Sequence, residues 1–209
     1  THDNLDKDPY MAFEKDFMRF MLSDGAGAVL VQDHPEGICP LKIEWVDMTS
    51  YANELPTCMF MASELQENGR LKSWKEFSPD EIKARAVLVG KQDIRQLKKY
   101  IIKYWVDHIE TVLAKHHVKA EEIDYVIPHV SSMFFYEKLN DEIAARNIAL
   151  TKEKWFTNLT SVGNIGSAAI YVALEELIRT KEIKRGNKIL LLVPESGRFS
   201  YGTVLLTSE

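Results

Sequence analysis

The sequence contains few cysteines, no excess of basic residues and no long apolar run, and each of these shortages excludes a class of protein. Cys39 and Cys58 are the only cysteines among 209 residues, so a disulfide-built scaffold is excluded and a reducing cytoplasm is the expected location. The net charge of −5 comes without the basic stripe that binds phosphates, so nucleic acid is not an expected partner. No apolar run approaches the roughly 20 residues that span a bilayer, so the sequence predicts no membrane insertion.

The composition and the apolar periodicity indicate a packed α/β domain. Hydrophobic residues make up 45% of the chain and charged residues 27%, which is ordinary for a globular protein with its own core. Apolar residues recur with the helical period over residues 91–116, which predicts one long amphipathic helix. An irregular excursion is predicted over 49–80, with a hairpin near Gly69. The remaining apolar runs predict further helices over 131–146 and 163–180, and strands over 23–31, 41–48, 125–127, 155–158, 188–193 and near the end of the chain.

Two polar side chains stand where α/β sheets gather their ligand sites. His129 follows the predicted strand 125–127 and Pro128, and Asn164 stands at a glycine-flanked helix start. An imidazole and a carboxamide both carry N–H donors, which suit an oxygen that becomes anionic. The pattern alone leaves a simpler interpretation open, because a histidine after proline is often a surface residue and an asparagine before a helix is often only an N-cap.

Four segments, in this order, resemble motifs of the ketoacyl-ACP synthase III family of thiolase-like condensing enzymes. Residues 23–28, SDGAGA, are similar to the family's GDGAGA strand, and residues 128–132, PHVSS, are similar to its PHQAN segment. Residues 163–169, GNIGSAA, resemble its GNTSAAS segment, and residues 197–202, GRFSYG, resemble its closing GGFTWG turn. Each motif is short, so the order and the spacing over nearly the whole chain carry the resemblance.

The resemblance implies one half of a thiolase-like fold, which is an α/β domain with a five-stranded mixed sheet flanked by helices. Residues 1–33 would then be the last strand of the amino-terminal half, and residues 34–209 would be the carboxy-terminal domain. In the family the two halves pack by pseudo-twofold symmetry and the whole protein is a homodimer, so an isolated half is expected to expose a large apolar face. The chain begins at Thr1 and not at methionine, which fits a piece of a longer protein.

The resemblance also implies a chemistry, the decarboxylative Claisen condensation of an acyl thioester with malonyl-ACP in fatty acid or secondary-metabolite synthesis. His129 and Asn164 would hold the malonyl carbonyl oxygen by hydrogen bonds that strengthen as CO₂ leaves. The backbone at Gly197 and Arg198 would contribute to a second oxyanion hole. The expected substrates and partners are acyl-CoA, malonyl-ACP and the acyl carrier protein, and no metal or organic cofactor is expected.

Two departures from the family pattern limit this expectation. The family's nucleophilic cysteine precedes the GDGAGA strand, but residues 1–22 contain no cysteine. Cys39 and Cys58 open no helix that would lower a thiol pKa, so both are expected to be inert and the chain alone inactive. Phe134 stands where the family often places an arginine that meets the acidic carrier protein, which leaves carrier docking and substrate choice open.

Other interpretations of the sequence remain open. The chain could be a non-catalytic subunit that pairs with a partner carrying the cysteine, or an acyltransferase that uses the same fold. His108, His116 and His117 lie on or just after the long helix without a third metal ligand at a usable spacing. These three histidines are therefore predicted to be solvated.

Overall fold

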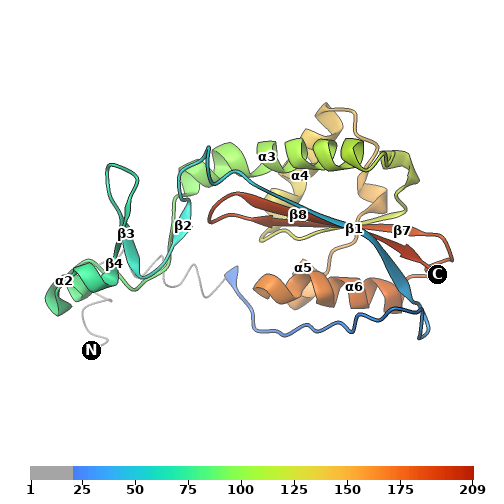
Figure 1. Ribbon diagram of the computed structural model, residues 1–209, viewed down its shortest axis with the longest axis horizontal. Coiled ribbons are helices and arrows are strands. Elements are labelled where there is room, and N and C mark those ends of the chain that lie inside the picture. The colour runs from blue at the N-terminus through green and yellow to red at the C-terminus, as the bar shows by residue number, and fades with distance from the viewer. Residues whose placement is uncertain (1–20) are drawn as a thin grey trace.

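A four-stranded mixed sheet forms the centre of the protein, whose computed structural model describes residues 21–209 (Figure 1). The strand order is β1-β8-β7-β6, in which β6 and β7 are parallel and the other neighbours are antiparallel. The strands are β1 (Leu41–Ser50), β6 (Tyr125–Pro128), β7 (Lys188–Glu195) and β8 (Ser200–Ser208). The predicted α/β fold with a mixed, helix-flanked sheet is therefore confirmed.

Helices cover both faces of the sheet (Figure 1). The helices α3 (Ile94–Lys115) and α4 (Met133–Ala145) pack on one face, and α5 (Leu159–Val162) and α6 (Ala169–Thr180) lie on the other. The strand β7 is buried on both faces, because its side chains alternate between the two helical layers. Leu190 and Leu192 join the core under α3, whereas Ile189 and Leu191 join the core under α6. The unbroken apolar run in this part of the sequence follows from that double burial.

The helix α3 confirms the long amphipathic helix that was predicted over residues 91–116. It begins at Ile94 because Asp93 caps it, accepting hydrogen bonds from the backbone N–H groups of Arg95 at 2.9 Å and Gln96 at 3.1 Å. Its core-facing stripe is made of the residues Leu97, Ile101, Trp105, Val106, His108, Ile109, Val112 and Leu113. The packed stripe, more than helix propensity, holds the helix on the sheet.

The predicted irregular excursion forms an arm that projects from the sheet (Figure 1). Its hairpin pairs β3 (Ser63–Leu65) with β4 (Leu71–Ser73), and Gly69 in the turn has a φ of 81°, which favours glycine. The prediction of a hairpin at this place is confirmed. The other short elements are β2 (Met59–Phe60), η1 (Trp74–Glu76), α2 (Pro79–Ala84), β5 (Lys91–Gln92), η2 (Ala120–Glu122), η3 (Lys152–Lys154) and η4 (Gly166–Ala168).

The predicted fifth strand of the sheet is reduced to a single bridge within residues 21–209. Trp155 forms an isolated parallel bridge with Val126 on β6, and the backbone N–H of Phe156 donates to the Val126 carbonyl at 2.8 Å. The chain then turns at Asn158 into α5, so the extended run is too short for a ladder. The sheet therefore has four strands in the described part of the chain, and the predicted count of five was wrong.

The strand predicted over 23–31 is not formed, and two of its glycines lie against neighbouring side chains. A Cβ on Gly25 would lie 2.8 Å from a side-chain atom of Ile165, and a Cβ on Gly27 would lie 2.8 Å from Tyr171. Side chains of α6 and of the loop before it, and not another strand, thus face this segment, and a strand needs a strand partner for its backbone groups. Residues 1–20 lie outside the described residues, and the division into 1–33 and 34–209 stays a prediction.

Several large apolar side chains are exposed on β1 and in the segment before it. Val46 is 65% exposed and Met48 is 75% exposed on β1, the edge strand of the sheet. Leu30 is 83% exposed in the segment that runs past α6. The large uncovered apolar face expected of an isolated half stays a prediction. The helices of residues 21–209 include none that is long and apolar enough to cross a membrane.

Candidate functional site

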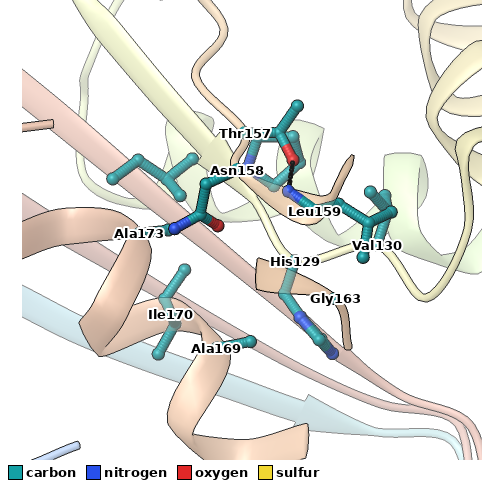
Figure 2. Close-up of a pocket in the computed structure, with 11 residues that line it drawn as sticks. His129, Val130, Thr157, Asn158, Leu159, Gly163, Ala169, Ile170 and Ala173 are labelled. Carbon is teal, nitrogen blue, oxygen red and sulfur yellow. Dashed lines mark hydrogen bonds between the residues drawn. The ribbon is translucent and has the colours of Figure 1, made fainter. Parts of the chain in front are cut away.

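His129 follows β6 and lines a small cavity between the sheet and the α5–α6 layer (Figure 2). Its backbone N–H donates to the carbonyl of Leu192 on β7 at 2.8 Å, which fixes the residue at the carboxyl end of the parallel strand pair. The cavity has a volume of about 20 Å³, room for about one water molecule. Its wall also includes Thr157, Asn158, Leu159, Gly163 and Ile170.

The His129 ring is half-buried, and its surroundings favour the neutral form. Burial lowers the pKa of His129 by desolvation, with no opposing charge as a second cause. At neutral pH the ring therefore carries one N–H donor and one acceptor nitrogen. Within the described residues, neither ring nitrogen is engaged by another side chain or by the backbone, so the donor is free for a ligand.

Asn164 lies on the loop that borders the same cavity. The short helix α5 is followed by Gly163, which caps its carboxyl end with a φ of 82°, a backbone conformation that favours glycine. Gly163 also lines the cavity. The Asn164 side-chain oxygen accepts a hydrogen bond from the backbone N–H of Gly166 at 3.1 Å, which leaves its Nδ2 as a donor. The structure thus brings the loop that carries Asn164 to the wall of the His129 cavity, although Asn164 itself is not a lining residue.

The helix predicted to open at residue 163 begins six residues later. Residues 163–168 form a loop and the turn η4, and α6 starts at Ala169 and ends at Thr180, the end that was predicted. The glycines in the loop explain the delay, because Gly163 and Gly166 both have positive φ values, of 82° and 61°. Asn164 therefore lies in a loop before the helix and not at the cap itself.

The sequence analysis did not identify Asn158, which also lines the cavity. Its Nδ2 donates to the Oε2 atom of Glu176 on α6 at 2.7 Å. The backbone pattern assigned residues 155–158 to a strand, and nothing in that pattern distinguishes a side chain that reaches across to a helix. Only the tertiary structure reveals this pair.

Gly197 and Arg198 lie in the turn between β7 and β8, and both of their backbone N–H groups are already engaged. The Glu195 carboxylate accepts both hydrogen bonds: Oε1 accepts from the Gly197 N–H, and Oε2 accepts from the Arg198 N–H at 3.0 Å. The Arg198 guanidinium donates to the Thr57 hydroxyl at 3.0 Å. The positive φ of this turn occurs at the next residue, Phe199, with a value of 53°. The second oxyanion hole predicted at these two amides stays a prediction.

Neither cysteine is an activated nucleophile. Cys58 is fully buried, its Sγ donates to the Asp93 carbonyl at 3.3 Å, and burial raises the pKa of its thiol to about 11. Burial also raises the pKa of the Cys39 thiol. Both groups are therefore protonated thiols at neutral pH, as the sequence predicted.

Two of the three histidines predicted to be solvated are in fact packed. His108 is fully buried on the α3 stripe, and its Nε2 lies 3.0 Å from the Thr203 hydroxyl on β8. His116 stacks on Trp45 with 4.2 Å between the ring centroids, and its Nε2 lies 2.8 Å from Asp47 Oδ2. The helical period of α3 places His108 on its core face, which the earlier interpretation overlooked. Residues 21–209 contain no cluster of three or more His, Cys, Asp or Glu side chains that could hold a metal ion.

A second and larger hollow lies between α3 and α4, with a volume of about 480 Å³. Ile102, Phe134 and Phe135 form its apolar part, and Phe134 is 52% exposed. Its basic side chains are Lys98, Lys99, Lys103 and Lys138. We call this hollow the α3–α4 groove.

Comparison with known proteins gives one consistent family. The family model described as 3-oxoacyl-[acyl-carrier-protein (ACP)] synthase III C terminal matches residues 113–207. A β-ketoacyl-[acyl-carrier-protein] synthase III of Clostridium acetobutylicum is 30% identical over 112 residues, which cover 54% of this chain and 33% of that protein. Its counterpart in Clostridium perfringens strain ATCC 13124 is 27% identical over 186 residues, which cover 89% of this chain and 52% of that protein.

Solved structures agree with the sequence relatives. The crystal structure of 3-oxoacyl-[acyl-carrier-protein] synthase III from Aquifex aeolicus aligns with a TM-score of 0.55 at 26% identity, covering 80% of this chain and 44% of that one. The corresponding enzyme of Pseudomonas aeruginosa PAO1 aligns with a TM-score of 0.57 at 19% identity, covering 79% and 45%, and this likeness is one of fold. The chain spans between a third and about half of the length of the curated relatives it matches. In its sequence over residues 113–207 and in its fold, the chain is similar to the carboxy-terminal part of the ketoacyl-ACP synthase III family.

Proposed function

We propose that this chain provides the malonyl-binding and decarboxylating half of a 3-oxoacyl-ACP synthase III-like condensing enzyme. The observation that carries the proposal is the half-buried, neutral His129 in a cavity whose wall continues into the Asn164 loop. Two N–H donors at one site are suited to an oxygen that becomes anionic during a reaction.

The proposed reaction uses these donors on the carbonyl oxygen of a malonyl thioester. The bond to the malonyl carboxylate breaks, CO₂ leaves, and the electron pair moves through the carbon onto the thioester oxygen. The N–H of His129 and the Nδ2–H of Asn164 donate to that oxygen, and both hydrogen bonds strengthen as its charge grows. The enolate carbon then attacks an acyl thioester, forms the new carbon–carbon bond and expels the thiolate that carried the acyl group.

The acyl-carrying thiol must come from outside the described residues in this scheme. Cys58 is buried with a pKa raised to about 11, and Cys39 lies before β1 without an activating neighbour. We therefore expect residues 21–209 alone to condense nothing. The matched segments cover only 33% and 52% of the two relatives, which leaves room in such proteins for a half that carries the nucleophile.

The decisive experiment measures CO₂ release from a malonyl thioester by the complete protein that carries this chain. His129→Ala and Asn164→Ala are each expected to lower the turnover rate by about 10²–10³-fold, the typical cost of losing one oxyanion donor. Cys58→Ala is the matched control and is expected to leave the rate unchanged, because that thiol is buried away from the cavity. Decarboxylation at the original rate in either donor variant would refute the assignment.

The proposed carrier of the malonyl group is an acyl carrier protein that docks at the α3–α4 groove. The groove carries four lysines and two acidic residues, Asp141 and Glu142, so its lining has an excess of positive charge that suits an acidic, amphipathic surface. In this proposal that excess compensates for Phe134 at the position where the family often has arginine. Reversing two of these charges, Lys98→Glu with Lys138→Glu, is expected to raise the KM for malonyl-ACP about tenfold and to leave the KM for malonyl-CoA unchanged. The control reverses the charge of two exposed lysines elsewhere, Lys119 and Lys181. An equal increase in the KM for malonyl-ACP in both double variants would refute the docking site.

The same proposal includes acyl-CoA as the acyl donor, no bound cofactor, a cytoplasmic location and a homodimer of the complete protein. A second candidate function is a non-catalytic subunit that pairs with a cysteine-bearing partner. The engagement of the Gly197 and Arg198 amides by Glu195 favours it, because those donors are then unavailable to a substrate oxygen. The CO₂ assay separates the two candidates, because a silent subunit would be unaffected by His129→Ala.

A further inference from the structure

Asn158 and Glu176 form a hydrogen bond that links two elements around the cavity. Neither residue lies in one of the four sequence motifs. Asn158 opens α5 and Glu176 lies on α6, with 2.7 Å between Asn158 Nδ2 and Glu176 Oε2. The Glu176 side chain is 26% exposed, so the pair is partly shielded from water. A hydrogen bond to an ionised carboxylate is roughly twice as strong as one between neutral groups.

The pair fixes the orientation of the Asn158 carboxamide. With Nδ2 on Glu176, the oxygen Oδ1 is the atom turned toward the cavity that His129 also lines. Figure 2 shows the carboxamide over Ile170 and Ala173 of α6 and the His129 ring extending on the Gly163 side. Asn158 thus forms one wall of the cavity and His129 another.

The backbone of Asn158 also holds the loop that carries Asn164. Its carbonyl accepts hydrogen bonds from the N–H of Ser161 at 3.0 Å, from the N–H of Val162 at 2.9 Å and from the Ser161 hydroxyl at 3.0 Å. These contacts close the single turn of α5, which ends at Gly163 directly before Asn164. A four-residue helix is not stable by itself, so its position depends on such anchors.

We propose that Asn158 and Glu176 are positioning residues for the reaction at His129 and Asn164. Glu176 fixes the Asn158 carboxamide on α6, and Asn158 in turn fixes both the wall beside His129 and the turn that presents Asn164. The inference rests on the proposed function, since it assigns these two residues a role in the same decarboxylation. A displacement of about 1 Å at a reacting group is enough to cost on the order of 10²-fold in rate.

The first test compares Glu176→Gln and Asn158→Ala with a matched control, Glu175→Gln. Glu175 lies on the same helix and its side chain is 65% exposed, so its replacement removes the same charge without the cavity contact. In the complete protein, Asn158→Ala is expected to lower kcat for malonyl decarboxylation roughly 10–100-fold and to change KM less than about threefold. Glu176→Gln is expected to have a smaller effect in the same direction, and Glu175→Gln is expected to have none.

The second test uses pH and a swap of the two groups. Asn158→Asp places two carboxylates together, which share a proton only at low pH, so decarboxylation is expected to fall as pH rises. The other titratable groups facing the pair are Arg179, with 3.9 Å between its Nη2 and Glu176 Oε1, and His129 across the cavity. The double variant Asn158→Asp with Glu176→Gln restores a hydrogen bond with the donor on residue 176, and kcat is expected to return to within about threefold of the original.

The two proposals fail in distinguishable ways. Unchanged decarboxylation in His129→Ala would end the proposed function and the positioning role with it. If His129→Ala abolishes the reaction but Asn158→Ala and Asn158→Asp keep the original kcat and pH profile, the positioning role alone is refuted. The pair itself is tested in the isolated chain, where the Asn158 side-chain amide resonances are expected to shift in Glu176→Gln and not in Glu175→Gln.

Discussion

Acidification is expected to destabilise this protein well above the pH at which carboxylates titrate, because His108 is buried in its neutral form. The side chain is fully inaccessible to solvent, with Nε2 3.0 Å from the Thr203 hydroxyl and no partner for Nδ1 among the described residues. Desolvation lowers the pKa of His108 and outweighs the opposing influence of the Asp47 charge. A proton on this ring would be a charge with no counter-ion in contact.

The sign of the effect follows from the difference between the two states. Unfolded, His108 has a pKa near the ordinary value of about 6.5, and folding lowers it, so the unfolded chain takes up the proton first as the pH falls. The stabilising contribution is complete above that pH and is lost below it, at a slope approaching about 1.4 kcal/mol per pH unit for one proton. Between pH 7.5 and 5.0 the loss is therefore at most about 2 kcal/mol, which is reached if the folded ring stays neutral over that range.

The assay is urea denaturation of the chain at pH 7.5 and pH 5.0, followed by tryptophan fluorescence. His108→Gln cannot take up the proton, so its free energy of unfolding is expected to fall less between pH 7.5 and pH 5.0 than that of the original chain, by up to about 2 kcal/mol. His117→Gln is the control, because His117 is exposed. Equal losses of stability in the original chain and in His108→Gln would refute the reasoning, whatever the absolute stability of the variant.

Two further predictions concern contacts that hold α3 in place. Tyr201→Phe removes a buried hydroxyl that donates to the Ile101 carbonyl at 2.9 Å, and it is expected to lower the free energy of unfolding by about 1 kcal/mol in urea denaturation. Arg146→Met leaves three carboxylates without the guanidinium that joins α4 to α3, including Asp107 at 2.6 Å, and is expected to cost roughly 1–2 kcal/mol. That loss is expected to shrink in about 1 M salt, which screens partly exposed ion pairs, and a loss independent of salt concentration would contradict an electrostatic role.

The parts of the fold that could be predicted from the sequence are those whose signal is periodic and local. The helix α3 repeats its apolar stripe over many turns, and β7 is an unbroken apolar run, so both were located to within a few residues. Residues 23–31 have a strand-like sequence as well, but pairing depends on a neighbouring strand, and the described residues place α6 beside them. Local composition cannot report whether a partner strand is present.

The candidate site divides in the same way. His129 and Asn164 could be nominated because each sits in a short motif, and the structure places one at the cavity and the other on its bordering loop. The pair of Asn158 and Glu176 leaves no trace in the sequence, since a hydrogen bond between residues on different elements has no fixed spacing. The hydrogen bonds from the Gly197 and Arg198 amides to the Glu195 carboxylate could not be predicted either, because they depend on the backbone conformation of the turn.

The left-handed backbone at Phe199 has a consequence for the order in which this protein assembles. A bulky residue in that conformation costs roughly 1–2 kcal/mol, but its ring is completely enclosed and meets Tyr100 of α3 edge-on. Burial of a phenylalanine contributes about 2–3 kcal/mol, so the bend is favourable only once α3 lies against the sheet. We therefore expect the turn between β7 and β8 to acquire its final shape only after α3 has packed, so that a contact with α3 supports the turn whose two amides Glu195 holds.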